Sequence, residues 1–262
     1  MNGPRRDAHE RCDDGTPLCA RLRVSLLQHT PDPDRAVAIA GRLCYAPVSA
    51  ADLRQEMSDD DVARLVRILV RSGHHSALEH AVFSFAADGV SRACTHQLVR
   101  HRVASYNQQS QRYVNFGAAD SFVVPPSIAG NEEARAVFLR AMEDARVAYD
   151  RLVELGLAEG RTRESVQEDA RFVLPNAAET KIVVTMNARE LRHFFQVRCC
   201  NRAQWEIRDL AWTMRAMVKD VAPNLFEGSG PGCLYGTCPE GKMTCGTPYR
   251  PEDVDPPAAA RP

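Results

Sequence analysis

Residues 180–198 read TKIVVTMNARELRHFFQVR. The segment from Thr180 to Met186 is rich in β-branched side chains, which favour a strand. Asn187 follows at once, with Glu190 three residues later, and this spacing is typical of a capping-box start for a helix. Leu191, Phe194 and Phe195 then recur at helical spacing as far as Arg198. The stretch therefore predicts a strand that leads directly into a helix.

The rest of the chain predicts further strands scattered among helices. Strands are expected at 24–28 and 81–87, and 103–116 is expected to be a polar connecting segment. Helices are expected at 34–43, 59–72, 91–102, 131–155, 163–173 and 202–221. Because strands and helices do not alternate regularly, we expect one α+β domain with a mixed or antiparallel sheet flanked by helices.

The two ends of the chain differ from the middle in composition. Residues 1–22 show no periodicity and are expected to form a flexible arm. Residues 23–226 carry the periodic segments and are expected to be the single folded domain. Residues 227–262 form a tail rich in Gly, Pro and Cys, of which 247–262 is expected to be disordered.

Composition excludes several classes of protein. With 262 residues, 44% hydrophobic and 26% charged, the chain matches an ordinary globular protein and not a disordered one. Its net charge of −1 argues against a general nucleic-acid or membrane-surface binder. We find no apolar run long enough for a signal peptide or a membrane span. Nine cysteines without a secretion signal favour reduced thiols in the cytoplasm.

The window 91–119, SRACTHQLVRHRVASYNQQSQRYVNFGAA, contains no Asp or Glu. It carries four arginines and two histidines, namely Arg92, Arg100, Arg102, Arg112, His96 and His101. On a helix Gln97, Arg100 and His101 would share one face, and a row of neutral polar residues follows them. Such a mixture suits a ligand that has both phosphates and a base edge, although a solvated basic face has the same composition.

Arg198 continues the apolar stripe of its predicted helix, at i+7 from Leu191 and i+4 from Phe194. A charge that points with core-facing residues costs several kcal/mol unless it is paired or meets a ligand. The sequence therefore leaves two interpretations: the guanidinium reaches out at the helix end, or it meets an anionic or carbonyl-rich ring.

The run RHRVASYNQQSQRY at 100–113 closely resembles RHRxxSxNxxSxRY, the signature of the flavin-dependent thymidylate synthases. GHHSALEH at 73–80 resembles an upstream motif of that family, and Asn187–Arg189 and Gln204–Arg208 resemble downstream segments. The resemblance covers roughly residues 22–226 and implies the fold of that family, with residues 23–226 as its catalytic domain.

The resemblance also implies site residues. The residues expected to bind FAD are Ser76, Arg100, His101, Arg102, Gln108, Asn187, Arg189 and His193. Those expected to bind dUMP are Gln97, Leu98, Val99, Arg100, Gln108, Gln109, Ser110, Gln111, Arg112, Arg171 and Arg198. Among these, Arg198 is expected to be catalytic, by engaging the pyrimidine. Gln108 and Gln111 stand where many relatives carry glutamate and glycine.

The implied reaction is reductive methylation of dUMP to dTMP. Methylenetetrahydrofolate would supply the carbon, and NADPH would reduce FAD, which would supply the hydride. The family builds its sites between the subunits of a homotetramer and uses no cysteine nucleophile. The resemblance implies neither a nucleic-acid partner nor a membrane, and the cytoplasm is the expected location.

Two other functions remain open from the residues alone. The arginine-rich window could bind nucleic acid, with Tyr106 and Tyr113 as stacking platforms. Cys199 or Cys200 could instead attack the pyrimidine, as in a cysteine-nucleophile methyltransferase. No metal is assigned to His74, His75 and His80. Cys199 or Cys200 could, however, bind zinc with Cys233, Cys238 and Cys245, and these thiols could equally form a disulfide or stay free.

Overall fold

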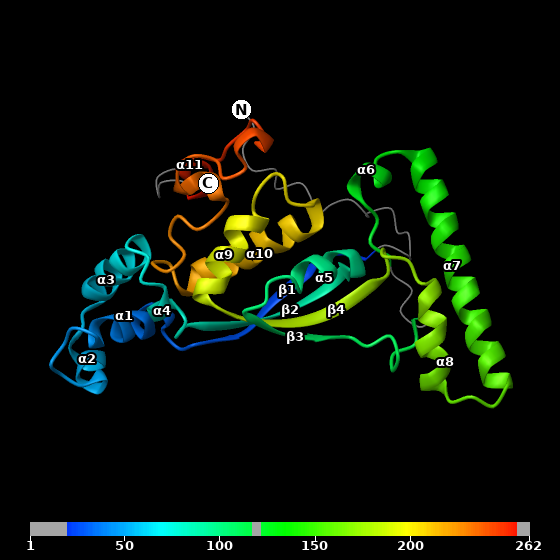
Figure 1. The fold of residues 1–262 in the computed structure, drawn as a ribbon, viewed down its shortest axis with the longest axis horizontal. Coiled ribbons are helices and arrows are strands. Elements are labelled where there is room, and N and C mark those ends of the chain that lie inside the picture. Colours follow the sequence, from blue (N-terminus) through cyan, green and yellow to red (C-terminus); the bar gives the residue numbers. More distant parts are fainter. Residues whose placement is uncertain (1–19, 117–121, 256–262) are drawn as a thin grey trace.

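The computed structural model describes residues 20–116 and 122–255. Its centre is a four-stranded sheet in the order β1-β2-β4-β3, in which every neighbouring pair is antiparallel. The strands are β1 (Arg23–His29), β2 (Val82–Ser91), β3 (Ala104–Gln108) and β4 (Glu179–Asn187). Helices lie on one face of this sheet and at both of its ends (Figure 1), which confirms the predicted α+β class with an antiparallel sheet.

One face of the sheet carries the main core. Along β4, Ile182, Val184 and Met186 are buried, whereas Lys181 and Val183 point to the other face and are exposed. The buried face packs against α5 (Arg92–Leu98), α9 (Ala188–Arg198) and α10 (Trp205–Val221), which lie together on one side of the sheet (Figure 1). The strand-to-helix unit predicted at 180–198 therefore forms the middle of the molecule.

Four helices lie at one end of the sheet (Figure 1). They are α1 (Pro33–Leu43), α2 (Ala50–Glu56), α3 (Asp59–Arg71) and α4 (His75–Leu78). Side chains of Asp32, Ser49 and Ser58 cap the first three by accepting a backbone hydrogen bond. These caps explain why the predicted helices at 34–43 and 59–72 are confirmed to within about a residue or two.

A pair of helices extends from the opposite end of the sheet (Figure 1). It consists of α7 (Glu132–Ala158) and α8 (Arg163–Ala170), with the 3-10 helix η3 (Arg171–Val173) after α8 and the short α6 (Pro126–Ala129) before α7. Tyr149 and Val166 belong to a second, smaller core at this end. The helices predicted at 131–155 and 163–173 are confirmed.

The predicted connecting segment at 103–116 is wrong in its first part, because 104–108 form the edge strand β3. The sequence ASYNQ has little β-propensity, and the strand exists because its backbone pairs with β4 from Ala104↔Met186 to Gln108↔Ile182. The helix predicted at 91–102 is correspondingly shorter and ends at Leu98, since the chain must turn before it enters β3.

The tail beyond Glu227 is more ordered than expected. It contains the 3-10 helices η4 (Gly232–Tyr235) and η5 (Gly241–Met243) and the short helix α11 (Pro251–Val254). The expectation of disorder is wrong for 247–255, because Asp255 accepts hydrogen bonds from Arg215 at 2.7 Å and from Lys219. Most of the arm predicted at 1–22 lies outside the described residues. The last seven residues of the chain also lie outside them.

The length and hydropathy of the helices show whether any of them could span a membrane. Over the described ranges, the helices are too short or too polar to cross a bilayer.

We expect Asp34→Ala to lower the free energy of unfolding by about 2–4 kcal/mol, because buried N–H groups lose their acceptor. The Asp34 carboxylate is buried and accepts from the backbone N–H of Asn224 and of Leu225, each at 3.0 Å, and from Asn224 Nδ2 at 2.7 Å. Urea unfolding measures the change. Asp144→Ala, at an exposed position of α7, is the control, and equal stability of the two variants would contradict the assignment.

Candidate functional site

The site is built around Arg198, the last residue of α9. Its Nε donates to His101 Nε2 at 3.0 Å, and its Nη2 lies 3.4 Å from the carbonyl oxygen of Gln97. Both acceptors are uncharged, and no carboxylate of the described residues pairs with this guanidinium. Burial lowers the pKa of Arg198. The half-buried guanidinium is thus held in one orientation, with no counterion in the part of the chain that the structure describes.

His101 is held on several sides. Its ring packs edge-on against Phe194, with the two ring centroids 4.9 Å apart. The Tyr106 hydroxyl lies 2.7 Å from the His101 carbonyl oxygen and 2.8 Å from that of Leu98. The second ring nitrogen, Nδ1, lies 3.3 Å from Oε1 of Glu190. Burial, together with the positive charges of Arg198 and His193, lowers the pKa of His101 to about 4.

Apart from Gln108, which lies on β3, the residues expected to bind FAD come from three segments that contact one another at α9. Ser76 lies on α4, Arg100 and Arg102 follow α5, and Asn187, Arg189 and His193 lie on or beside α9. The ion pair Arg189–Glu79, at 2.5 Å, and the His101 and His193 rings, 5.8 Å apart, connect these segments. The Arg100 and Arg102 side chains are exposed and form no ion pair with other described residues.

The first group expected to bind dUMP lies at the end of α5. Gln97 is half-buried and Val99 and Arg100 are exposed, so all three can reach a ligand. The Leu98 side chain is completely buried in the main core, so a contact from this residue would have to come from its backbone.

The second group expected to bind dUMP runs from β3 into the following turn. Gln108 Nε2 donates to Thr95 Oγ1 at 3.0 Å and to Thr180 Oγ1 at 3.2 Å, so its amide connects α5 with the sheet. Gln109, Ser110 and Gln111 line a small hollow together with Thr180. The uncharged Gln108 thus donates to two hydroxyl groups, one on α5 and one on β4.

Arginine side chains gather where α8 ends. Arg112 Nη2 pairs with Glu164 at 2.7 Å and Glu168 at 3.3 Å, whereas its buried Nε has no hydrogen-bond partner among the described residues. Arg171 Nε donates to the Glu168 carbonyl oxygen. Arg92 lies close enough to Arg171 that burial and this like charge lower the Arg92 pKa.

Arg92 was not assigned a role from the sequence, although it belongs to the acid-free window. Its proximity to Arg171, 79 positions along the chain, comes from the tertiary structure, in which the backbone N–H groups of Arg92 and Ala93 donate to the segment that follows η3. The window 91–119 contains no acidic residue in its sequence, but acidic side chains lie near it in the structure. Glu164, Glu168 and Glu190 approach it from other segments.

The capping box predicted for Asn187 and Glu190 forms only in part. The Asn187 side chain does cap α9, by accepting from the backbone N–H of Glu190 at 2.9 Å. The Glu190 carboxylate, however, does not complete a capping box with Asn187 but is turned towards His101. It is buried, and burial raises its pKa. The spacing that predicted a cap could not reveal this second partner.

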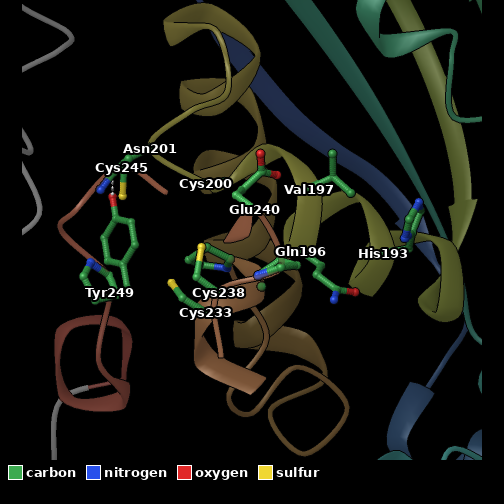
Figure 2. Close-up of a pocket in the computed structure, with 14 residues that line it drawn as sticks. His193, Gln196, Val197, Cys200, Asn201, Cys233, Cys238, Glu240, Cys245 and Tyr249 are labelled. Carbon is green, nitrogen blue, oxygen red and sulfur yellow. Dashed lines mark hydrogen bonds between the residues drawn. The ribbon is translucent and has the colours of Figure 1, made fainter. Parts of the chain in front are cut away.

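The cysteines lie beside this site rather than in it. Cys200, Cys233, Cys238 and Cys245 line one cavity of ≈ 240 Å³, and His193 lies at the end away from Tyr249 (Figure 2). Cys199 is completely buried, and burial raises its pKa. Within residues 20–116 and 122–255, no three His, Cys, Asp or Glu side chains are arranged to hold a metal ion.

Comparison with known proteins gives consistent results. Residues 25–224 match the family model described as thymidylate synthase complementing protein. A flavin-dependent thymidylate synthase of Geobacter sulfurreducens is 57% identical over 227 residues, which cover 86% of this chain and 94% of the relative. One of Clostridium tetani is 49% identical over 233 residues, covering 86% and 93%.

A solved structure has the same fold. It is a UMP/dUMP methylase, PolB, from Streptomyces cacaoi, bound with 5-Br dUMP, at 28% identity and a TM-score of 0.67. The match covers 80% of this chain and 95% of that one. Together with the signature at 100–113 and the family match over most of the chain, these likenesses show that the protein belongs to the flavin-dependent thymidylate synthase family.

Proposed function

We propose that the protein methylates dUMP to dTMP, using bound FAD as the hydride carrier. The observation that carries the proposal is Arg198: a half-buried guanidinium that neutral acceptors orient and that no described carboxylate neutralises. Such a group is suited to a ligand that develops negative charge, as the pyrimidine ring of dUMP does when its C5 position becomes nucleophilic. Membership of the family and the dUMP analogue bound by the Streptomyces cacaoi methylase support this substrate.

The nucleotide phosphate would bind the arginines near α8. Arg112 offers a buried Nε that has no partner among the described residues, and Arg92 and Arg171 place two like charges near each other. Both features are unfavourable in the protein alone, and a phosphate would relieve them by accepting charge-assisted hydrogen bonds. Ser110 and Gln109 would add neutral contacts.

FAD fits the residues near the start of α9. Arg100 and Arg102 are exposed guanidinium groups without ion pairs to other described residues, so they can bind the pyrophosphate. Ser76, Asn187, Arg189 and His193 would line the same site. When bound, FAD supplies the redox chemistry, while the protein binds and orients the reactants.

NADPH and methylenetetrahydrofolate are the proposed co-substrates, and the cytoplasm is the proposed location. We also propose a homotetramer whose subunits share the active sites. The face of the sheet opposite the main core supports assembly, because Val82 and Val183 are exposed on it and present apolar surface to water. A second copy of the chain could cover this face and bring further site residues together.

The two alternatives are less well supported. A nucleic-acid module would use Tyr106 as a stacking platform, but the Tyr106 hydroxyl donates to the backbone carbonyl groups of Leu98 and His101, which hold the ring against the protein. A cysteine nucleophile requires an accessible thiolate, whereas burial raises the pKa of both Cys199 and Cys200.

Arg198→Ala should slow dTMP formation by about 100- to 1,000-fold, the usual effect of removing one preorganised donor to developing charge. Single-turnover assays with flavin-loaded protein, dUMP and methylenetetrahydrofolate measure the rate. Arg64→Ala, on the exposed face of α3, is the matched control. A rate in Arg198→Ala equal to that of the control would remove the role proposed for Arg198.

Arg92→Ala should raise the dissociation constant for dUMP by about 10- to 100-fold, because a charge-assisted hydrogen bond to phosphate is lost. The affinity for deoxyuridine, which has no phosphate, should not change. Calorimetric titration of both ligands gives the comparison. Equal losses for nucleotide and nucleoside would show that Arg92 does not contact the phosphate.

The double variant Cys199→Ala with Cys200→Ser should keep a rate of dTMP formation within about 3-fold of the wild type, since neither thiol is activated as a nucleophile. Its stability should fall, because Cys199 is completely buried in the main core. Turnover and thermal unfolding are measured on the same preparation. A folded, flavin-loaded variant without activity would favour the cysteine-nucleophile mechanism instead.

A further inference from the structure

We propose that Glu190 is a positioning residue for Arg198: acting through His101, it orients the guanidinium that faces the pyrimidine. The proposal rests on the function proposed above for Arg198 and adds a third residue behind it. No member of this chain of contacts is adjacent to the next in sequence, since Arg198 and Glu190 lie at opposite ends of α9 and His101 follows α5.

The direction of the hydrogen bonds follows from the chemistry of the three groups. A guanidinium group has five N–H donors and no acceptor. Arg198 Nε, 3.0 Å from His101 Nε2, must therefore donate, and Nε2 must carry no proton. A neutral imidazole then has its only proton on Nδ1, which lies 3.3 Å from the Glu190 carboxylate. We infer that Glu190 Oε1 accepts the hydrogen bond from this proton.

Glu190 is the contact that selects the orientation of the imidazole. The edge-on contact with Phe194 restrains the plane of the ring, but an apolar contact does not distinguish the ring from its flipped form. A flip would replace Nε2 by a carbon opposite Arg198 and release the guanidinium. A carboxylate that accepts from Nδ1 stabilises only the orientation in which Nε2 faces Arg198.

The charge state of His101 agrees with this arrangement. Burial and the charges of Arg198 and His193 lower its pKa to about 4, so the ring is neutral at neutral pH and Nε2 is free to accept. The other charged or titratable groups around the pair are Arg189 on α9, which counteracts the effect of burial on the pKa of Glu190, and Tyr106 on β3, whose pKa is raised by burial and by Glu190.

The role of Glu190 in the helix cap can be separated from its contact with His101. The cap uses the backbone N–H of Glu190, which donates to Asn187 Oδ1, and any residue at position 190 supplies that N–H. Substitution of the side chain therefore leaves the cap in place and tests the carboxylate alone.

The test is a double-variant cycle on the flavin-loaded full chain, read by single-turnover dTMP formation. Glu190→Ala should reduce the rate by about 10- to 100-fold in the wild-type background, as expected when a reacting group loses its alignment. In the Arg198→Ala background Glu190→Ala should reduce the rate by less than about 2-fold, because the two substitutions remove the same interaction. Equal losses in both backgrounds would show a merely structural role and overturn the proposal.

Rescue by a conservative variant provides a second readout. Glu190→Gln should stay within about 3-fold of the wild-type rate, because its amide oxygen can accept from Nδ1–H. The affinity for dUMP should fall less than the rate does in Glu190→Ala, since the phosphate arginines are untouched. A Glu190→Gln variant as slow as Glu190→Ala, or a wild-type rate in Glu190→Ala, would overturn the proposal.

Asp34→Asn is the matched control, because Asp34 is also a buried carboxylate but lies outside the site. It should lower stability without changing the rate. A normal rate in Arg198→Ala would contradict the proposed function and the positioning role together, whereas a loss confined to Arg198→Ala would contradict the positioning role alone.

A measurement on the unchanged protein covers the case in which Glu190→Ala fails to fold. Nitrogen-15 NMR of histidine-labelled protein should show His101 neutral, with its proton on Nδ1 and Nε2 unprotonated. Protonation on Nε2 would overturn the proposal.

Discussion

The site depends on a hydrogen bond from a charged donor to a neutral acceptor, between Arg198 and His101. A carboxylate in place of the imidazole would hold the guanidinium equally well, but it would also neutralise the charge that a reacting ring needs. A neutral imidazole orients the group and leaves its charge available. This arrangement leaves a half-buried cation, which is unfavourable, and burial accordingly lowers the pKa of Arg198.

The fold supplies this geometry through α9 and the strand before it. β4 is the strand between β2 and β3, and it passes directly into α9, so the start of the helix is fixed relative to the sheet. The first turn of α9 carries residues proposed to bind the flavin, and its last residue is Arg198. One helix therefore sets the separation between the two halves of the proposed site, and the buried Phe194 and Phe195 hold it against the core.

Elements with strong local signals were predictable from the sequence. Ser58 as a cap and Thr180–Met186 as a β-branched strand both depend on neighbours within a few positions, and both are confirmed. β3 was missed because its residues have little preference for a strand and pair only because β4 offers a free edge. The ordered segment 247–255 was missed because Asp255 is bound by Arg215 and Lys219, and both of these partners lie more than thirty positions away in the sequence.

For the site, the signature at 100–113 was enough to identify the family and to predict which residues to examine, since residue types at fixed spacing are a property of the chain alone. The sequence could not show which acids face the basic window, that Arg92 lies beside Arg171, or that Glu190 turns to His101 instead of closing a capping box. Those pairings depend on distances through space, where electrostatic interactions and burial act between segments that lie far apart in the sequence, 89 positions in the case of His101 and Glu190. Only the packing of α5, α8 and α9 around the sheet decides them.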